Sequence, residues 1–126
     1  MNAEKPAPRD IQERTMEFAL RAIRLYRHLQ KTRDGAAWVL GKQMLRSATS
    51  VGANVQEAQS GESRADFIHK FSIAQKEARE CLYWLKLLLR SEVITADKLQ
   101  PLITENDEVL AIITRIILNT KQNRDT

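Results

Sequence analysis

Apolar residues recur at three- and four-residue intervals along four stretches of the chain, with polar residues at the positions between them. Such spacing gathers the apolar side chains on one face of an α-helix and leaves the other faces to water. We predict four helices, over residues 10–31, 36–59, 63–91 and 95–120. Pro101 lies inside the last of these, and because it lacks a backbone N–H it predicts a kink or a ragged helix start.

Turn and cap residues support these bounds. Asp10, followed by Glu13, predicts an N-cap for the first helix, because its carboxylate can accept a hydrogen bond from the first turn. Gly61 predicts a left-handed terminator after the second helix. Ser63 and Thr95 predict N-caps for the third and fourth helices.

The fold class follows from the helix count and the composition. A chain of 126 residues fits one domain, and four Gly and three Pro leave little material for the turns of an all-β fold. Short connections make consecutive helices antiparallel neighbours. We therefore predict an all-α protein, an antiparallel up-down four-helix bundle over residues 10–120. Residues 1–9 are expected to be a disordered arm, and residues 121–126 a polar tail.

Three of the predicted helices carry more apolar surface than one bundle buries. On the third helix, for example, an apolar strip stands roughly opposite the core-facing stripe. Large exposed apolar patches usually mark interfaces, so we predict a homo-oligomer. The interface candidates are Ile23, Ile73, Trp84, Leu87, Ile112 and Ile116. A thick core covered by long side chains is the alternative interpretation.

Basic residues are unevenly distributed in a chain of formal net charge +4. They concentrate on the first and third predicted helices. The third helix places basic residues and an aromatic on one narrow strip: Lys76, Arg79, Tyr83, Lys86 and Arg90. A phosphate backbone with an occasional stacked base suits such a strip, so we predict contact with RNA or DNA. Arg24, Arg27 and Lys31 of the first helix would extend it in an oligomer. A solvated charged face, partly neutralised by Glu77 and Glu80, is the alternative.

Polar residues also occur among small ones on the second predicted helix, where close helix approach is possible. A buried carboxylate must be paired, and Arg46 of the same chain or of a neighbouring subunit is a possible partner for Glu57. We predict that Arg46, Asn54 and Glu57 form a structural polar network, in preference to a ligand site.

The sequence gives little support for a metal site or for catalytic activity. Glu62, Asp66 and His69 share a helix face, but dimetal bundles use two Glu-x-x-His pairs, so we interpret them as solvated capping residues. Cys81 lies on the core stripe and is interpreted as a small hydrophobe. The sequence contains no Gly-rich phosphate loop, nucleophile elbow or Cys/His cluster. We predict a protein that is not an enzyme and needs neither metal nor cofactor.

The expected compartment is the cytoplasm. A single cysteine allows no internal disulfide, which fits a reducing environment. The N-terminal residues show no apolar segment of a signal peptide, and no run approaches the roughly 18 apolar residues that span a bilayer. We expect no membrane association.

Residues 43–57 resemble a motif, Q-x-x-R-x-A-x-S-I-x-x-N-I-x-E, of bacterial four-helix-bundle proteins encoded in intervening sequences of large-subunit ribosomal RNA genes. Gly52 stands where that family commonly has proline. The similarity continues through Phe67-Ile68, Ser72-Ile73-Ala74, and Glu80 with Tyr83-Trp84-Leu85, and covers about residues 10–120.

The resemblance implies a ring-shaped homopentamer of up-down bundles without established enzymatic activity. A related group, the accessory proteins of diversity-generating retroelements, has a similar fold and binds a reverse transcriptase and RNA through a basic surface. The leading expectation is therefore an oligomeric binding module for RNA or DNA. A protein-interaction scaffold or accessory subunit without nucleic-acid binding is the alternative, and weak salt dependence of binding would identify it.

Overall fold

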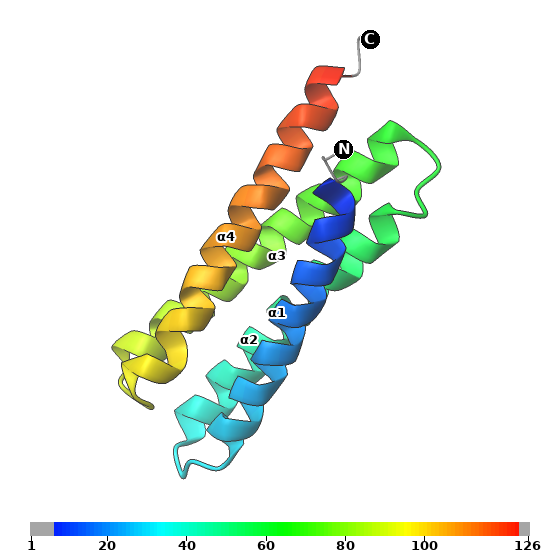
Figure 1. Cartoon of the computed structure of the whole chain (residues 1–126). Helices are drawn as coiled ribbons and strands as arrows, with labels where there is room; N and C mark the ends of the chain where they lie inside the picture. The colour runs from blue at the N-terminus through cyan, green and yellow to red at the C-terminus, as the bar shows by residue number, and fades with distance from the viewer. Residues whose placement is uncertain (1–6, 124–126) are drawn as a thin grey trace.

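The computed structural model describes residues 7–123, and side chains from residue 11 to residue 123. Four helices and no strand occupy this part of the chain: α1 (Ala7–Gln30), α2 (Gly35–Ala58), α3 (Arg64–Arg90) and α4 (Ala96–Gln122). The predicted all-α class with four helices is confirmed. Figure 1 shows the α1–α2 and α3–α4 connections at one end of the molecule and the α2–α3 connection at the other.

The first and last helices extend beyond their predicted ends. Because α1 begins at Ala7, Asp10 lies inside the helix, and the predicted N-cap at Asp10 is wrong. The predicted arm thus loses residues 7–9 to α1, and residues 1–6 lie outside the described part. The predicted tail loses Lys121 and Gln122 to α4, and residues 124–126 lie outside the described part.

The α2–α3 connection differs from its prediction. Gly61 has no positive φ, so it is not a left-handed terminator. Instead, α2 ends in a tightened turn, in which the N–H groups of residues 59–61 bond to carbonyls three residues earlier. Glycine is favoured here by space, since a Cβ on Gly61 would lie 3.2 Å from the carbonyl oxygen of Ala58.

Of the two other predicted N-caps, the one at Ser63 is confirmed and the one at Thr95 lacks its side-chain hydrogen bond, while Asp34 provides an N-cap that was not predicted. Asp34 caps α2 by accepting from Ala36 N at 2.9 Å, and Ser63 caps α3 by accepting from Asp66 N at 3.1 Å. Thr95 occupies the N-cap position of α4 without a side-chain cap hydrogen bond. In the described residues the left-handed backbone conformation occurs at Glu92, after α3, with φ 59°. The α4 helix continues through Pro101 without interruption.

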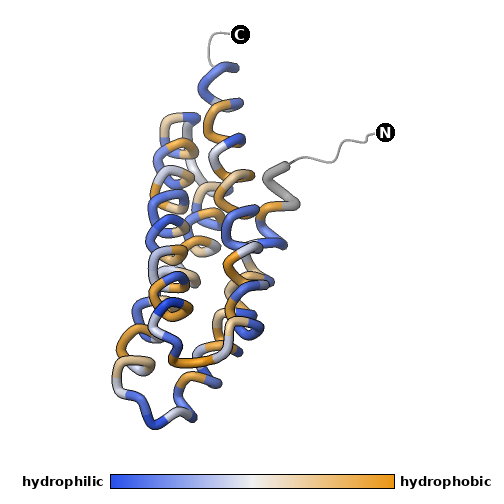
Figure 2. The backbone as a smooth tube through the Cα atoms, turned by 90° about the vertical axis from the view of Figure 1, so that its left-hand side faces the viewer, coloured by the Kyte–Doolittle hydropathy of each residue, from blue (hydrophilic) through white to orange (hydrophobic). Residues whose placement is uncertain are grey.

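Two adjoining apolar clusters fill the bundle, and each draws on all four helices. Phe18, Met44 and Leu85 belong to the cluster near the α1–α2 connection, while Phe71 and Ile113 belong to the other. Apolar and polar positions alternate along every helix in Figure 2, as expected for helices with one buried face. The residues of α1 that recur at the three- and four-residue intervals of a core stripe are all buried: Ile11, Thr15, Phe18, Ala22, Leu25 and Leu29.

The helices pack unequally. α2 packs most extensively, against α1 and α3, and the contact between α1 and α4 is the smallest of the four neighbouring pairs. Because α1 and α3 each contact α2 and α4, they lie diagonally across the bundle. Surface residues of α1 and of α3 therefore face different sides of the molecule.

Candidate functional surfaces

The predicted basic strip of α3 is on the surface. Its members Lys76, Arg79, Tyr83, Lys86 and Arg90 are all exposed. Within the described residues none of the four cations forms an ion pair. The Tyr83 ring is 58% exposed and meets the Trp84 ring edge-on, with centroids 5.1 Å apart. The strip thus offers four unpaired cations and one accessible aromatic face.

The acidic neighbours do not neutralise this strip by direct pairing. Glu77 and Glu80 are half-buried on the side of α3 next to the strip. The Glu80 carboxylate accepts a long hydrogen bond from the Trp84 indole, Nε1 to Oε2 at 3.4 Å. Neither carboxylate forms an ion pair with a basic residue of α3.

The corresponding strip of α1 is exposed at Arg24, Arg27 and Lys31. Because α1 and α3 are diagonal in the bundle, one chain does not join the two strips. The predicted extension from one strip to the other would need a second copy of the chain.

The six predicted interface residues divide into three groups. Ile116 is 5% exposed and belongs to the core, which corrects its assignment to a surface. Trp84 and Ile112 are half-buried and pack partly against the core clusters. Ile23, Ile73 and Leu87 are half-buried and belong to neither cluster. The apolar arc of α4 is wide because one side of it contacts α1 and the other contacts α3.

Two exposed apolar residues near the start of α2 do not follow the helical period of the core stripe and were not predicted. Trp38 is 44% exposed and Val39 is 62% exposed. The Trp38 indole donates to the Thr32 carbonyl at 3.0 Å, which holds the ring beside the α1–α2 turn. Both residues lie outside the core stripe of α2, which begins at Ala37, and their signal in the sequence is only a pair of large apolar residues off that stripe.

A shallow apolar groove lies between α1 and α2, with a volume of about 270 Å³. Met16, 57% exposed, forms one wall, and small residues including Gly52 and Ala53 form the other. A Cβ on Gly52 would lie 3.3 Å from Thr15 Cβ and 3.4 Å from the Thr15 carbonyl oxygen. The expectation that small residues of α2 permit close helix approach is confirmed at this position.

The predicted polar network of α2 is not formed within one chain. The Asn54 amide donates to the Ser50 carbonyl at 2.9 Å and to the Ser50 hydroxyl at 3.2 Å. Glu57 and Arg46 are exposed, and neither side chain has a hydrogen bond or an ion pair in the described part of the chain. The premise of a buried carboxylate was wrong, because Glu57 lies on the solvent side of α2.

The residues considered for metal binding and nucleophilic chemistry have ordinary surroundings. Glu62, Asp66 and His69 are exposed, and in residues 7–123 no three His, Cys, Asp or Glu side chains gather in a metal-binding arrangement. Cys81 is buried, and its thiol donates to the Met44 carbonyl at 3.8 Å. Burial in the core raises the pKa of the Cys81 thiol to about 12, since desolvation disfavours the thiolate.

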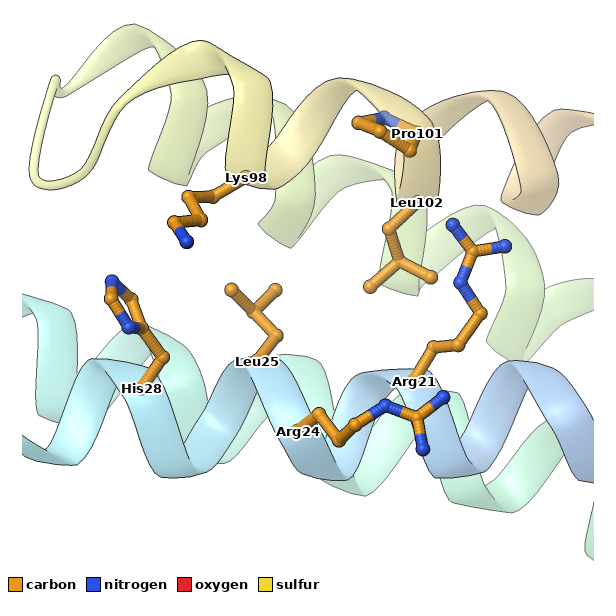
Figure 3. A pocket seen from close by; sticks show the side chains of 7 residues that line it. All are labelled: Arg21, Arg24, Leu25, His28, Lys98, Pro101 and Leu102. Carbon is orange, nitrogen blue, oxygen red and sulfur yellow. The ribbon is translucent and has the colours of Figure 1, made fainter.

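An ion-pair cluster closes one part of the contact between α1 and α4. The Arg14 guanidinium donates to both carboxylate oxygens of Glu105, at 3.2 and 2.8 Å, and to Glu108 at 2.8 Å. These hydrogen bonds raise the pKa of Arg14. Farther along the same contact a cleft contains basic side chains whose proximity was not predicted from the sequence (Figure 3).

These features define a class: an all-α, four-helix bundle protein with basic and apolar surface strips. The chain belongs to the family of 23S rRNA-intervening sequence proteins, whose family model matches residues 9–115. It is similar to a crystal structure of a protein with unknown function from the S23 ribosomal protein family of Bacteroides thetaiotaomicron. The two are 40% identical, with a TM-score of 0.82, and the match covers 89% of this chain and 98% of that chain.

The motif resemblance to proteins of ribosomal RNA intervening sequences is thereby confirmed. No curated protein shows a significant similarity to the chain. None of the helices in the described part of the chain is long and apolar enough to cross a membrane.

Proposed function

We propose that this chain is a non-enzymatic, cytoplasmic binding module that contacts RNA or DNA. In this proposal the antiparallel up-down bundles assemble into a ring-shaped homopentamer. The basic strip of α3 is the contact surface for the phosphate backbone, and no cofactor takes part. The exposure of the strip, together with the lack of carboxylate partners for its cations among residues 11–123, is the observation that supports this function best.

The geometry of the strip suits a nucleic-acid strand. Residues 76 to 90 span about 21 Å of helix at 1.5 Å per residue, so several phosphates fit along it. Lysine and arginine neutralise phosphates and release counterions, which supplies most of the affinity in sequence-independent binding. The exposed Tyr83 ring, between Arg79 and Lys86, offers a face on which a base can stack.

Half-buried apolar residues support the assembly. Ile73 and Leu87 of α3 and Ile23 of α1 stay partly exposed on one chain and contribute to neither core cluster. Association of copies would remove this surface from water at roughly 25 cal/mol per Å², before the entropic cost of association is subtracted. A ring would also bring the α1 strip of one copy toward the α3 strip of another, which a single bundle does not achieve.

Charge reversal tests the contact surface. We expect the triple variant Arg79→Glu, Lys86→Glu, Arg90→Glu to bind a single-stranded RNA at least tenfold more weakly than the wild type, measured by fluorescence anisotropy. The control variant Lys42→Glu, Arg64→Glu, Lys121→Glu carries the same net charge but alters exposed residues outside both strips. Equal losses in the two variants, or unchanged binding by the first, would contradict the assigned surface.

A protein-interaction scaffold is the second candidate function, favoured by the apolar side chains exposed around α1 and the start of α2. Met16 and Leu20 of α1 are 57% and 40% exposed, and Trp38 and Val39 of α2 are 44% and 62% exposed. Apolar docking to another polypeptide would depend little on salt, whereas polyanion binding weakens steeply as salt rises. Retained binding of a protein partner at high salt, with no RNA bound at low salt, would favour the scaffold.

A further inference from the structure

A cleft of about 350 Å³ opens between α1 and α4, where the helices of the bundle pack least extensively. Such a volume is within the usual range of small-molecule sites. Both helices contribute to its walls, which consist of Arg21, Arg24, Leu25, His28, Lys98, Pro101 and Leu102 (Figure 3).

The basic groups stand at the two ends of the cleft. Figure 3 shows His28 of α1 and Lys98 of α4 pointing toward one another at one end. At the other end the Arg21 side chain rises toward α4, and the Arg24 guanidinium lies in front of α1 on the Arg21 side. Leu25 and Leu102, which are 7% and 4% exposed, lie between the two ends and form an apolar floor.

Two features bring these basic residues together: their spacing along α1, and the packing of α4 against α1. Arg21, Arg24 and His28 follow one another at intervals of three and four residues, so they share one side of α1. Lys98 lies in the first turn of α4, which lies against α1. The cleft therefore gathers three basic residues from one helix and a fourth from a helix distant in sequence.

No carboxylate pairs with these basic groups in the described structure. Arg14 holds Glu105 and Glu108, the acidic residues of α4 that face α1. Glu17, one turn before Arg21, is exposed and forms no ion pair. Asp97, next to Lys98, is exposed; the neighbouring Thr95 hydroxyl and the positive charge of Lys98 both lower the pKa of Asp97, although no ion pair joins Asp97 and Lys98 within the described residues.

Unpaired like charges around a hollow repel one another, and a bound anion offsets that repulsion. We propose that the cleft between α1 and α4 binds a phosphate group carried by a nucleotide or by a nucleic-acid strand. Arginine presents a planar set of donors that matches phosphate oxygens in pairs, and lysine adds a compact positive charge. The apolar floor accommodates the uncharged part of the ligand next to the phosphate.

The site is separate from the proposed contact surface on α3. Only Arg24 belongs to both the cleft and a predicted nucleic-acid strip. Arg21, His28 and Lys98 belong to the cleft alone. Variants of Arg21 and Lys98 therefore test the cleft without altering the α3 strip.

Isothermal titration with pyrophosphate, a nucleoside triphosphate and a short single-stranded RNA tests the proposal on the full chain. We expect the variant Arg21→Gln, Lys98→Gln to lose at least tenfold in affinity for pyrophosphate and the nucleotide. The control variant Lys42→Gln, Arg64→Gln, with the same change of net charge, should stay within twofold of the wild type. Absence of pyrophosphate and nucleotide binding to the wild type at low salt, or equal loss in the control, would overturn the proposal.

Nuclear magnetic resonance of the wild type gives a second readout that needs no folded variant. Pyrophosphate should shift resonances of Arg21, His28 and Lys98 before those of Arg79 and Lys86; shifts confined to α3 would overturn the site. The RNA arm identifies the source of the phosphate: weaker RNA binding by the cleft variant indicates a strand, and unchanged RNA binding indicates a free nucleotide. Failure of the α3 charge reversal to weaken RNA binding would contradict the proposed function and leave the pyrophosphate result standing.

Discussion

Asn106 of α4 donates a hydrogen bond from Nδ2 to the backbone carbonyl oxygen of Ala78 in α3, at 2.9 Å, where Asn106 is completely buried. Its Oδ1 has no hydrogen-bond partner within the described residues. A buried acceptor without a partner loses its hydration without compensation, which destabilises the fold. The hydrogen bond nevertheless fixes the register of α4 against α3, and apolar packing surrounds it.

Replacing Asn106 tests this balance. Asn106→Leu removes both the satisfied donor and the orphaned acceptor, so we expect the free energy of unfolding to change by less than about 1 kcal/mol. Asn106→Asp places a carboxylate in the same site and should lower the free energy of unfolding at pH 7 by about 3 kcal/mol or more. Urea unfolding of both variants measures this, and equal stability would show that the site is not dry.

The pH dependence of Asn106→Asp provides the internal control. Burial should raise the pKa of the new carboxyl group above its unfolded value, so its ionisation opposes folding. The loss of stability should therefore be smallest below the unfolded pKa of about 4 and should grow as pH rises. A loss independent of pH would mean that the carboxylate reaches water.

Because α1 and α2 approach closely at Gly52, we expect alanine at this position to destabilise the fold, which is the opposite of its usual effect in a helix. A glycine-to-alanine change inside an exposed helix stabilises by about 1 kcal/mol through helix propensity. At Gly52 the new Cβ would lie 3.3 Å from both Cβ and Oγ1 of the buried Thr15, and overpacking costs about 1–3 kcal/mol. We expect Gly52→Ala to lower the free energy of unfolding by about 1 kcal/mol in thermal or urea unfolding.

Gly35→Ala is the matched control for Gly52→Ala. Gly35 begins α2, and a Cβ there would meet no atom within 4 Å. This change should leave stability unchanged or raise it. Equal stabilisation by the two variants would contradict the steric account of the α1–α2 contact.

The Cys81 thiol should be inert in the folded protein. Because burial raises the pKa of this thiol to about 12, almost no thiolate exists at pH 8. We expect a thiol reagent to modify Cys81 only as fast as the chain unfolds, and at once in 6 M guanidinium chloride. Rapid labelling without denaturant would show that the cluster around Cys81 opens locally.

The same shift in pKa makes the free energy of unfolding decrease as pH rises in the alkaline range. The ordinary pKa of the thiol in the unfolded chain is 9.0, whereas burial raises the pKa of Cys81 to about 12 in the folded protein. The contribution of Cys81 is therefore full below pH 9 and is lost as pH rises toward 12. The free energy of unfolding of Cys81→Ala should fall less steeply across this range than that of the wild type.

The features that could be predicted best from the sequence are those that depend on residues close together in the chain. Periodicity placed each helix end within about three residues and identified every core position of α1, because a buried stripe has a helical period. The cap at Ser63 could be predicted for the same reason, because its hydrogen bond joins residues only three positions apart. Gly61 was misinterpreted, since glycine can serve either a left-handed conformation or a tight steric fit, and the residue type does not distinguish them.

Contacts between segments distant in the chain could not be predicted from local sequence patterns. The basic cleft needs Lys98 to lie opposite His28, and only the pairing of α4 with α1 brings them together. The burial of Asn106 and the core position of Ile116 likewise depend on which helices flank α4. Glu57 is exposed on the single bundle for the same reason, because charge and spacing do not reveal which side of α2 packs against another helix.

Nucleic-acid binding by the α3 strip should have a measurable salt dependence. If the four cations Lys76, Arg79, Lys86 and Arg90 each neutralise one phosphate of a single strand, log K should fall with log salt at a slope of about −3 per strip. The charge-reversed variant at Arg79, Lys86 and Arg90 should lose most of this slope. Anisotropy titrations between 50 and 300 mM salt measure it, and a flat dependence would favour apolar docking.

Size-exclusion chromatography coupled to light scattering, at low and high salt with absorbance at 260 and 280 nm, tests the central claim most directly. The proposal of an oligomeric nucleic-acid-binding module predicts a species near five times the 14.5 kDa chain mass, carrying excess 260 nm absorbance that high salt removes. A single species of 14.5 kDa at both salt concentrations, without excess absorbance at 260 nm, would contradict it.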